Sequence, residues 1–388
     1  MIRILHVSEY AKGGVATYLH ILFQDPSHEV DNYLLVAHEN SDHVWEIPDD
    51  HIRYYNYVRG LRSLPEAITA VRSGIRDLHP DVVYFHSSWA GGFGRLALLG
   101  LTYRPVVFYN AHGWAFLRDT SMWKKHISAV VEHLLEYLTD TIICVSHYEY
   151  EAAKRYGLDV SKLKVLYSGI PDTMSDDMST ISNSMIERRV GELNLLFIGR
   201  WDKPKGLDLL LEQFIKCSRQ DLHLYVIGDS VIGYEHSDVL RLQRIMNDAR
   251  KDSRITFVGW VNRDNLPSWY AMCDAVIMPS RWEAFGLVAV EAMSCARPVI
   301  ASNRGALPEL IHPGENGYLF KLESKKYPSD RADYPCLAEL LDSLDFNTLY
   351  AMRHAARVAY EKKFTAQNLW ARLNLMYRNY LPFAEICR

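Results

Sequence analysis

The chain has 388 residues, of which 48% are hydrophobic and 23% are charged, and its formal net charge is −4 at pH 7. A globular composition at this length predicts two domains of roughly 150–200 residues and excludes a disordered or fibrous protein. The slightly negative charge excludes a global basic field, so no nucleic-acid partner is expected.

The six cysteines are scattered, with neither a C-x-x-C motif nor a metal-binding spacing. Several lie in apolar runs such as "TIICVS" and "AMCDAVIM", where cysteine acts as a small core residue, which predicts a reducing, cytoplasmic location. The start "MIRILHVSEY" leads directly into a strand without the features of a signal peptide, and no apolar run approaches the ~20 residues needed to span a bilayer. We expect a protein that is soluble or at most lies on a membrane surface.

In the first half of the chain, short apolar runs alternate with longer helical patterns. Continuously apolar strands separated by helices predict a parallel sheet covered on both faces, here over residues 1–170. The predicted helices include 65–78 and 122–138, and the predicted strands are 2–8, 32–38, 81–87, 105–112, 141–147 and 163–170.

Residues 171–192, rich in Ser, Asp and Met, interrupt this alternation and are predicted to link two domains. The alternation then restarts and predicts a second doubly wound α/β domain over 193–364. A charged insert at 323–335 is expected to be a surface loop, and the helix expected within 365–388 needs a surface, which we expect the first domain to provide. The strands predicted in the second domain are 193–200, 222–229, 255–260, 274–280 and 297–302.

Ligands of open α/β sheets bind beyond the carboxyl ends of the strands, so the residues that follow each strand are the candidates. Gly13-Gly14 opens a helix, and its backbone amides could approach a phosphate or a sugar closely, although a tight turn is the simpler explanation of the pair alone. We interpret Gly91-Gly92 as a turn that begins a helix. His112 follows a strand and is either a packed side chain or one that points into the ligand site.

Two cations and two carboxylates follow strands of the second domain. Arg200 and Lys205 bracket the loop before a helix that starts near Gly206, where they suit a diphosphate or are simply solvated charges. In "SRWEAFGLVAVEAMS", Glu283 precedes a helix and Glu291 lies about two turns into it. The pair either grips separated hydroxyls of a long ligand or consists of a helix cap and a buried, satisfied carboxylate.

The motifs "GGVATYL", "FIGRWDKPKGLDLLLE" and "MPSRWEAFGLVAVEAMSCARPVIASNRGALPELIHPGENGYLF" resemble those of glycosyltransferase family 4. Members of that family are retaining enzymes with the GT-B fold of two Rossmann-like domains that face a central cleft. The resemblance covers nearly the whole chain, and its most specific element is the E-x7-E pair of Glu283 and Glu291. Departures are Ser168-Gly169, where the family often has Asn-Gly, and Ala296, where it often has Gly.

The resemblance implies a nucleotide-sugar donor, with a UDP-sugar favoured. Glu291 would bind the ribose hydroxyls and Glu283 the sugar hydroxyls, while His112 would lie near the transferred sugar and stabilise a charge or a hydroxyl. Arg200 and Lys205 would neutralise the diphosphate leaving group. The remaining donor contacts would come from backbone, namely from Gly13 and Gly14, from Phe285, Gly286 and Leu287, and, at the base, from Trp260 and Val261.

No Asp-x-Asp motif is present, so neither a metal nor another cofactor is expected, and the fixed cations would stabilise the leaving group instead. The resemblance implies transfer with retention to a glycan or polyprenyl-diphosphate-linked acceptor in bacterial cell-surface polysaccharide synthesis. Basic and aromatic residues in 59–76 and 122–138 either form solvated helix faces or dock the protein on an anionic membrane at the inner face of the cell membrane. A nucleotide-sugar epimerase and a non-catalytic nucleotide-sugar-binding subunit remain as alternatives.

Overall fold

The computed structural model describes residues 1–172, 188–229, 236–322 and 334–381. The chain divides into two compact units: an N-terminal unit of Met1–Pro171 with Ala366–Arg388, and a C-terminal unit of Asp172–Thr365. Most of the predicted linker and most of the predicted charged insert, 173–187 and 323–333, lie outside the described residues.

The N-terminal unit contains a seven-stranded sheet in the order β3-β2-β1-β4-β5-β6-β7, and all of its strand pairs are parallel. Five of the seven strands fall on apolar runs four to eight residues long that tolerate burial on both faces. The strands are β1 (Ile2–Ser8), β2 (Val30–Ala37), β3 (Ile52–Tyr55), β4 (Val82–His86), β5 (Val106–Asn110), β6 (Thr141–Cys144) and β7 (Leu163–Val165).

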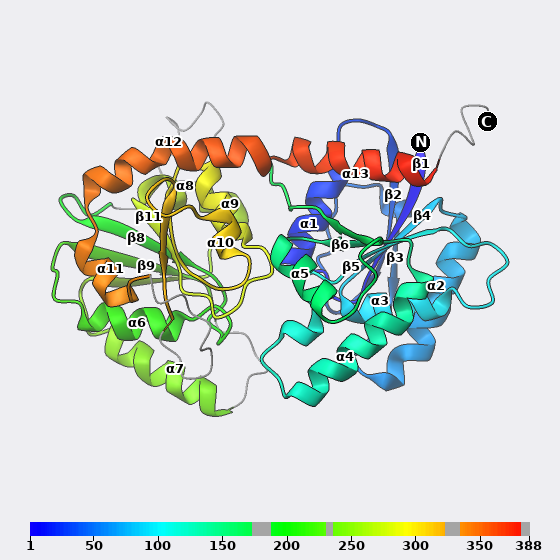
Figure 1. Ribbon diagram of the computed structural model, residues 1–388, viewed down its shortest axis with the longest axis horizontal. Coiled ribbons are helices and arrows are strands. Elements are labelled where there is room, and N and C mark those ends of the chain that lie inside the picture. The colour runs from blue at the N-terminus through cyan, green and yellow to red at the C-terminus, as the bar shows by residue number, and fades with distance from the viewer. Residues whose placement is uncertain (173–187, 230–235, 323–333, 382–388) are drawn as a thin grey trace. The chain divides into compact units, whose positions relative to one another are not determined.

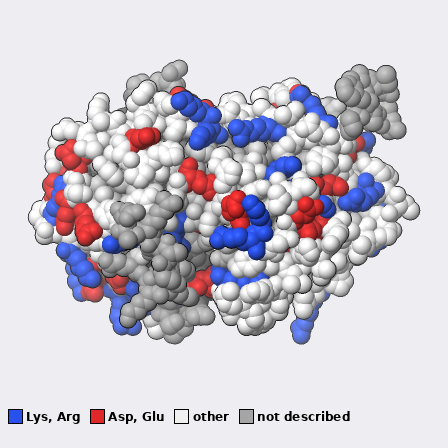
Figure 2. Space-filling view, viewed as in Figure 1, with Lys and Arg blue, Asp and Glu red and all other residues white. Residues whose placement is uncertain are grey.

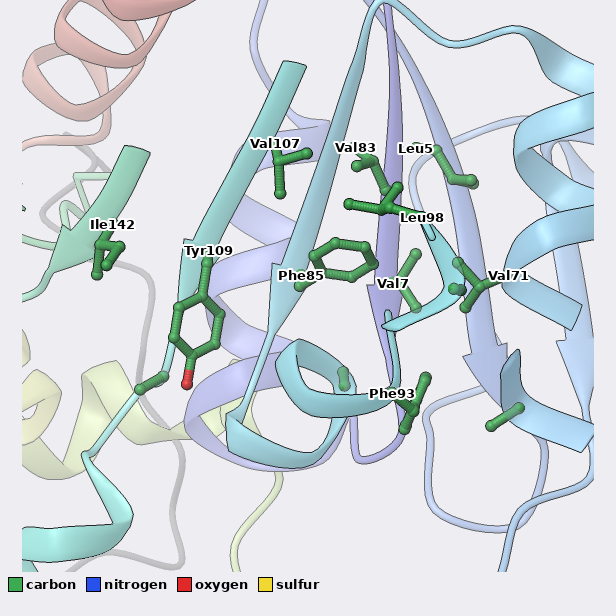
Figure 3. Close-up of a cluster of buried hydrophobic side chains, with 14 of the residues drawn as sticks. Leu5, Val7, Val71, Val83, Phe85, Phe93, Leu98, Val107, Tyr109 and Ile142 are labelled. Carbon is green, nitrogen blue, oxygen red and sulfur yellow. The ribbon is translucent and has the colours of Figure 1, made fainter. Parts of the chain in front are cut away.

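Helices cover both faces of this sheet (Figure 1). On one face, Val7, Phe85 and Tyr109 belong to a buried cluster with Val71 and Phe93 from two covering helices (Figure 3). The helices of the unit are α1 (Gly14–Phe23), α2 (Leu64–Leu78), α3 (Ser88–Ala97), α4 (Met122–Leu135), α5 (His147–Arg155) and α13 (Ala366–Tyr380).

The other face of the sheet packs against α1 and α13. The indole of Trp370 on α13 donates to the carbonyl of Ile21 on α1 at 2.7 Å, and the Phe108 ring of β5 lies 5.1 Å from that of Tyr377. The residues after Thr365 therefore complete the core of the N-terminal unit, although more than 200 residues of sequence separate them from α5.

The C-terminal unit contains a six-stranded parallel sheet in the order β10-β9-β8-β11-β12-β13. Its strands are β8 (Leu193–Ile198), β9 (Leu222–Ile227), β10 (Ile255–Gly259), β11 (Ala275–Met278), β12 (Val299–Ser302) and β13 (Gly317–Phe320). Its helices are α6 (Leu207–Lys216), α7 (His236–Ala249), α8 (Leu266–Met272), α9 (Leu287–Ser294), α10 (Leu307–Leu310), α11 (Leu337–Ser343) and α12 (Phe346–Lys363).

The structure corrects the interpretation of Gly91-Gly92 as a turn. Both glycines lie inside α3, and a Cβ on Gly91 would stand 2.3 Å from the Tyr109 ring, so this glycine lets the helix approach the sheet. Two short edge strands, β3 and β13, were also absent from the sequence prediction.

Cys144 and Cys273, which lie in apolar runs, are buried as expected, and Cys217 and Cys295 are buried as well. Within the described part of the chain, no helix is both long and apolar enough to cross a membrane. On the face drawn in Figure 2, basic and acidic side chains of the described residues are interspersed.

Candidate functional site

Each sheet has one point at which the order of its strands reverses. In the N-terminal unit this switch point lies between β1 and β4, and in the C-terminal unit it lies between β8 and β11. Loops that leave neighbouring strands on opposite faces open a crevice there, which is where α/β sheets bind their ligands. Most of the candidate residues follow the strands that flank these two points, whereas His112 follows β5, and Trp260 and Val261 follow β10.

In the C-terminal unit, a buried carboxylate organises the loop between β8 and α6. Asp202 accepts from Arg200 Nε at 2.7 Å with one oxygen and from the backbone N–H of Lys205 at 3.0 Å with the other. Asp202 is 4% exposed, whereas the Arg200 side chain is half exposed. The loop therefore holds Arg200 at the surface and fixes the backbone from which Lys205 projects.

The Lys205 side chain reaches across the switch point to the loop that follows β11. Its Nζ lies 2.9 Å from Glu283 Oε2, and the two side chains are 23% and 13% exposed. A charge-assisted hydrogen bond in this partly buried setting is stronger than a surface ion pair. The structure thus joins a cation and a carboxylate that stand 78 positions apart in the sequence.

Three glycines allow the close packing that positions this ion pair. Gly206, before α6, has φ 72°, and a Cβ on it would stand 2.0 Å from the carbonyl oxygen of Pro279. Gly305 has φ 59°, and its Cβ would stand 2.1 Å from the carbonyl oxygen of Glu283. Gly286, at φ 110°, precedes α9 and leaves Glu283 outside the helix. Only glycine adopts these backbone conformations without strain.

Glu291 lies on α9, and the hydroxyl of Tyr270 donates to its Oε2 at 2.7 Å. Burial raises the pKa of the Glu291 carboxyl, while the Tyr270 hydrogen bond and the charges of Arg263 and Lys205 partly offset the rise. Lys205 is therefore close enough to act on both glutamates.

The other sequence-predicted residues of this unit lie at the same edge of the sheet or just beyond it. Trp260 and Val261 follow β10, where Trp260 is 76% exposed and Val261 is partly buried. Phe285 is buried with its ring 5.9 Å from that of Phe364, and Leu287 is the first residue of α9.

In the N-terminal unit, Gly13 and Gly14 are exposed at the start of α1. Gly13 has φ 59°, and a Cβ at this position would contact nothing within 4 Å. His112, after β5, also has a left-handed backbone, with φ 48°, and its N–H donates to Asn110 Oδ1 at 2.9 Å. Left-handed conformations of non-glycine residues concentrate at functional sites.

The His112 ring ends a chain of three imidazoles. Its Nε2 lies 3.1 Å from His86 Nδ1, and His86 Nε2 lies 3.0 Å from His6 Nδ1. Burial lowers the pKa of His112 to about 3 and that of His6 to about 4, and it lowers the pKa of His86 further below its ordinary value. All three rings are therefore neutral near pH 7.

A second polar cluster was missed by sequence reasoning. Glu9, directly after β1, is 1% exposed, and its carboxylate accepts from the Ser87 hydroxyl and from Arg59 Nη2, the latter at 2.8 Å. Ser87 has φ 90°. The signal available in the sequence was that β1 and β4 each end in polar residues, "HVSE" and "FHSS".

No group of three or more His, Cys, Asp or Glu residues converges into a metal-binding arrangement in the ranges that the structure describes. The three histidines are joined in series, ring to ring, and do not surround a common point.

Two parallel, doubly wound units define a protein of the GT-B fold class. The structure is similar to that of Anabaena HepE in complex with UDP, with a TM-score of 0.77 at 20% identity, covering 97% of this chain and 100% of that chain. It is also similar to sucrose-phosphate synthase from Thermosynechococcus elongatus, with a TM-score of 0.79 at 18% identity, covering 98% and 99% of the two chains.

The chain belongs to the group 1, family 4 glycosyltransferases. The family model described as Glycosyltransferase Family 4 matches residues 12–173, and that described as Glycosyl transferases group 1 matches residues 192–330. An uncharacterised 41.2 kDa protein in the cps region of Klebsiella pneumoniae is 30% identical over 97% of this chain and 100% of its own length. The capsular polysaccharide biosynthesis glycosyltransferase CapM of Staphylococcus aureus is 25% identical over 79% of this chain and 78% of its own.

Proposed function

We propose that this protein is a retaining glycosyltransferase that transfers a hexose from a UDP-sugar to a glycan or polyprenyl-diphosphate-linked acceptor in bacterial cell-surface polysaccharide synthesis. The observation that carries the proposal is the Lys205–Glu283 ion pair at the switch point between β8 and β11. The UDP and UDP-glucose complexes of HepE, the cps region of the Klebsiella relative and the role in CapM's name support the choice of donor and of process.

On donor binding, Lys205 would exchange its carboxylate partner for the diphosphate. The ammonium then neutralises the charge that builds up on the leaving group, together with the half-exposed Arg200. Release from Lys205 frees the Glu283 carboxylate to accept hydrogen bonds from sugar hydroxyls. The same ion pair thus preorganises two binding groups in the absence of donor.

Glu291 would bind the ribose. One carboxylate oxygen is held by Tyr270, which fixes the orientation of the group, and a carboxylate has acceptor capacity left for the hydroxyls of a vicinal diol. The backbone at Trp260 and Val261 would meet the base. Further backbone contacts would come from Gly13, Gly14, Phe285, Gly286 and Leu287.

Attack on the same face as the departing diphosphate would account for retention without a protein nucleophile. We assign neither Glu283 nor Glu291 as nucleophile, because with donor bound the Glu283 carboxylate would accept from sugar hydroxyls and Glu291 is held by Tyr270. The leaving phosphate would take the acceptor proton, and His112 would contact the transferred sugar.

The experiment that tests the proposal compares Lys205→Met with Lys203→Met, which removes a cation from an exposed side chain of the same loop. Thermal shifts are measured against UDP-glucose, GDP-glucose and ADP-glucose, since a ligand of the folded state raises its stability. We expect a shift with UDP-glucose in wild type and in Lys203→Met, and at least about tenfold weaker binding in Lys205→Met, which is about 1.4 kcal/mol. Equal binding by all three proteins would contradict the proposed site.

We further propose that α4 docks the enzyme on the anionic inner face of the cell membrane, where a polyprenyl-linked acceptor would reside. An apolar strip along the helix and its continuation is 45–71% exposed, while the acidic residues Glu132 and Glu136 are buried. Lys124 is exposed at the start of α4, and Lys125 is partly exposed beside it. The exposed apolar residues are Met122, Trp123, Ile127, Val130, Val131, Leu134 and Tyr137.

Apolar side chains beside lysines suit the interface of an anionic bilayer. Flotation with phosphatidylglycerol vesicles at low salt is expected for wild type and for a control variant, Tyr350→Ser, whose side chain is 59% exposed on α12. The double variant Trp123→Ser/Ile127→Ser should remain in the unbound fraction. Failure of the wild-type protein to float would contradict membrane docking but would not bear on the proposed donor site.

A further inference from the structure

Three strands of the N-terminal sheet contribute to one line of buried imidazoles. His6 on β1 and His86 at the end of β4 lie on the sheet face that packs against α1, and His112 follows β5. Neighbouring ring centroids are 5.3 Å and 5.4 Å apart, and neighbouring ring nitrogens are 3.0 Å and 3.1 Å apart. Both separations are hydrogen-bonding distances.

The direction of the hydrogen bonds along this line is set at its far end. His6 Nε2 lies 3.0 Å from Asn32 Oδ1 on β2, and an amide oxygen can only accept, so His6 Nε2 carries the proton. A neutral His6 then accepts at Nδ1 from His86 Nε2–H. His86 in turn accepts at Nδ1 from His112 Nε2–H.

The consequence at the other end is a single tautomer of His112. Its Nε2 proton is committed to His86, so the Nδ1 nitrogen carries an unshared electron pair. Among the described residues, Nδ1 has no hydrogen-bond partner, and the residue is partly exposed. The free side of this ring is therefore an acceptor.

The surroundings keep every ring of the line neutral. His6 is flanked by Phe23 and Tyr84, and both His86 and His112 lie near Tyr18. Within the described part of the chain, the hydrogen-bond partners of the three rings are Asn32 and one another, and none of them is a carboxylate. Burial raises the pKa of Tyr18 to about 12 and raises that of Tyr84 as well, so both phenols stay un-ionised. Because the three imidazoles are neutral, they do not repel one another electrostatically.

The backbone conformation and the contacts of His112 also fix the position of its ring. His112 holds a left-handed conformation, with φ 48°, while its N–H is bonded to Asn110 Oδ1 and its ring lies edge-on to Tyr18 at 4.9 Å. Left-handed backbone is unfavourable for a non-glycine residue, so the surrounding contacts must hold His112 in this position.

We propose that Asn32, His6 and His86 are positioning residues that hold His112 as a neutral Nε2–H tautomer, so that its Nδ1 accepts a hydrogen bond from a hydroxyl of the transferred sugar. This inference rests on the proposed glycosyltransferase function and deepens it, because it assigns the direction of one hydrogen bond at the sugar. A donor whose sugar lacks that hydroxyl binds more weakly, since the donor complex then leaves the Nδ1 acceptor unpaired.

The first test needs no substrate. In the full chain labelled with ¹⁵N-histidine, the nitrogen chemical shifts of His112 report which ring nitrogen bears the proton. We expect protonated Nε2 and bare Nδ1 in wild type and in the control Tyr84→Phe, which removes a buried hydroxyl beside His86 without altering the line of imidazoles. In His86→Phe, whose ring has a similar size but no acceptor, the Nδ1–H tautomer of His112 becomes populated.

A wild-type His112 protonated at Nδ1, or a tautomer that stays unchanged in His86→Phe, would overturn the inference. A variant that unfolds is recognised by its lost chemical-shift dispersion, and His6→Gln then provides the second perturbation of the same line. Because these spectra are recorded without donor, their outcome is independent of whether the proposed function is correct.

The second test adds the sugar. UDP-glucose should shift the His112 Nδ1 resonance as this nitrogen gains a hydrogen bond, whereas UDP alone should not. His86→Phe should weaken UDP-glucose about fivefold, the equivalent of one ordinary hydrogen bond, and leave UDP affinity unchanged. An equal Nδ1 shift with UDP alone would overturn the sugar assignment, and absence of binding by either ligand would instead refute the proposed function.

Discussion

Acidification from pH 7 to pH 5 is predicted to destabilise the N-terminal unit through its line of buried histidines. Burial lowers the pKa of His6 from 6.5 to about 4 and that of His112 from 6.5 to about 3, and it lowers the pKa of His86 in the same direction. Between those values and 6.5 the unfolded chain binds more protons than the folded one. The N-terminal unit therefore has its full stability above the unfolded histidine pKa of 6.5. It loses stability as the pH falls from there towards the folded pKa values.

The size of the effect follows from this difference. At pH 5 an imidazole of unfolded pKa 6.5 is protonated in the unfolded chain and neutral in the folded unit, which costs about 2 kcal/mol per group. His6 and His112 together account for a loss of roughly 4 kcal/mol of stability, and His86 contributes a further loss. This is a large fraction of the roughly 5–15 kcal/mol that typically separates folded from unfolded domains.

Hydrogen exchange read by mass spectrometry on peptides from β1 and β4 measures the opening free energy of this unit alone, after correction for intrinsic exchange at each pH. The two units must be measured separately, because burial raises the pKa of Glu291 in the C-terminal unit. A raised carboxyl pKa makes acid stabilise the folded state, which is opposite to the effect of the histidines. His6→Gln removes one titrating group. The difference in opening free energy between pH 7 and pH 5 should therefore be about 2 kcal/mol smaller in this variant than in wild type. An opening free energy that is the same at both pH values would refute the neutral, buried line of histidines.

Further predictions concern backbone and site residues of the C-terminal unit. Ala296 follows α9 at φ 53° in a Schellman motif, so Ala296→Gly should stabilise the unit by about 0.5–1 kcal/mol in guanidinium titrations; a loss of stability would contradict the strain argument. Gly305→Ala should displace the Glu283 loop and weaken UDP-glucose at least about tenfold by calorimetry, with unchanged affinity as the contrary result. Tyr270→Phe should raise the pKa of Glu291 further, because it removes the hydrogen bond to the carboxylate. The infrared band of the protonated carboxyl group measures this pKa, and an unchanged titration midpoint would contradict the hydrogen bond.

The fold was largely predictable because its buried strands are continuous apolar runs. The strand β1, "IRILHVS", and the strand β8, "LNLLFI", stand out against the helices that follow them. The edge strand β3, "IRYY", could not be recognised, since it has four residues of which two are exposed and one is partly buried. Its place is set by pairing with β2, which is information that no local pattern contains.

Individual residues of the candidate site could be proposed from the sequence, but their arrangement could not. Lys205 and Glu283 were predicted to bind different parts of one ligand, yet their hydrogen bond depends on β8 and β11 being neighbours in the sheet. The line of imidazoles depends likewise on register. Ser8 stands opposite His86, and His86 opposite Asn110, so three separate strand ends meet. In the sequence, His6 and His86 are simply polar interruptions of apolar strands.

Retaining transfer from a UDP-sugar can be measured with methanol as a small acceptor. UDP-α-glucose, UDP-α-galactose and UDP-α-N-acetylglucosamine are each incubated with the full chain, and the methyl glycoside formed is identified by its anomeric proton resonance, which mutarotation cannot scramble. We expect a methyl α-glycoside from at least one donor and none from the Lys205→Met variant. A methyl β-glycoside, or no glycoside from any of the three donors, would contradict this expectation.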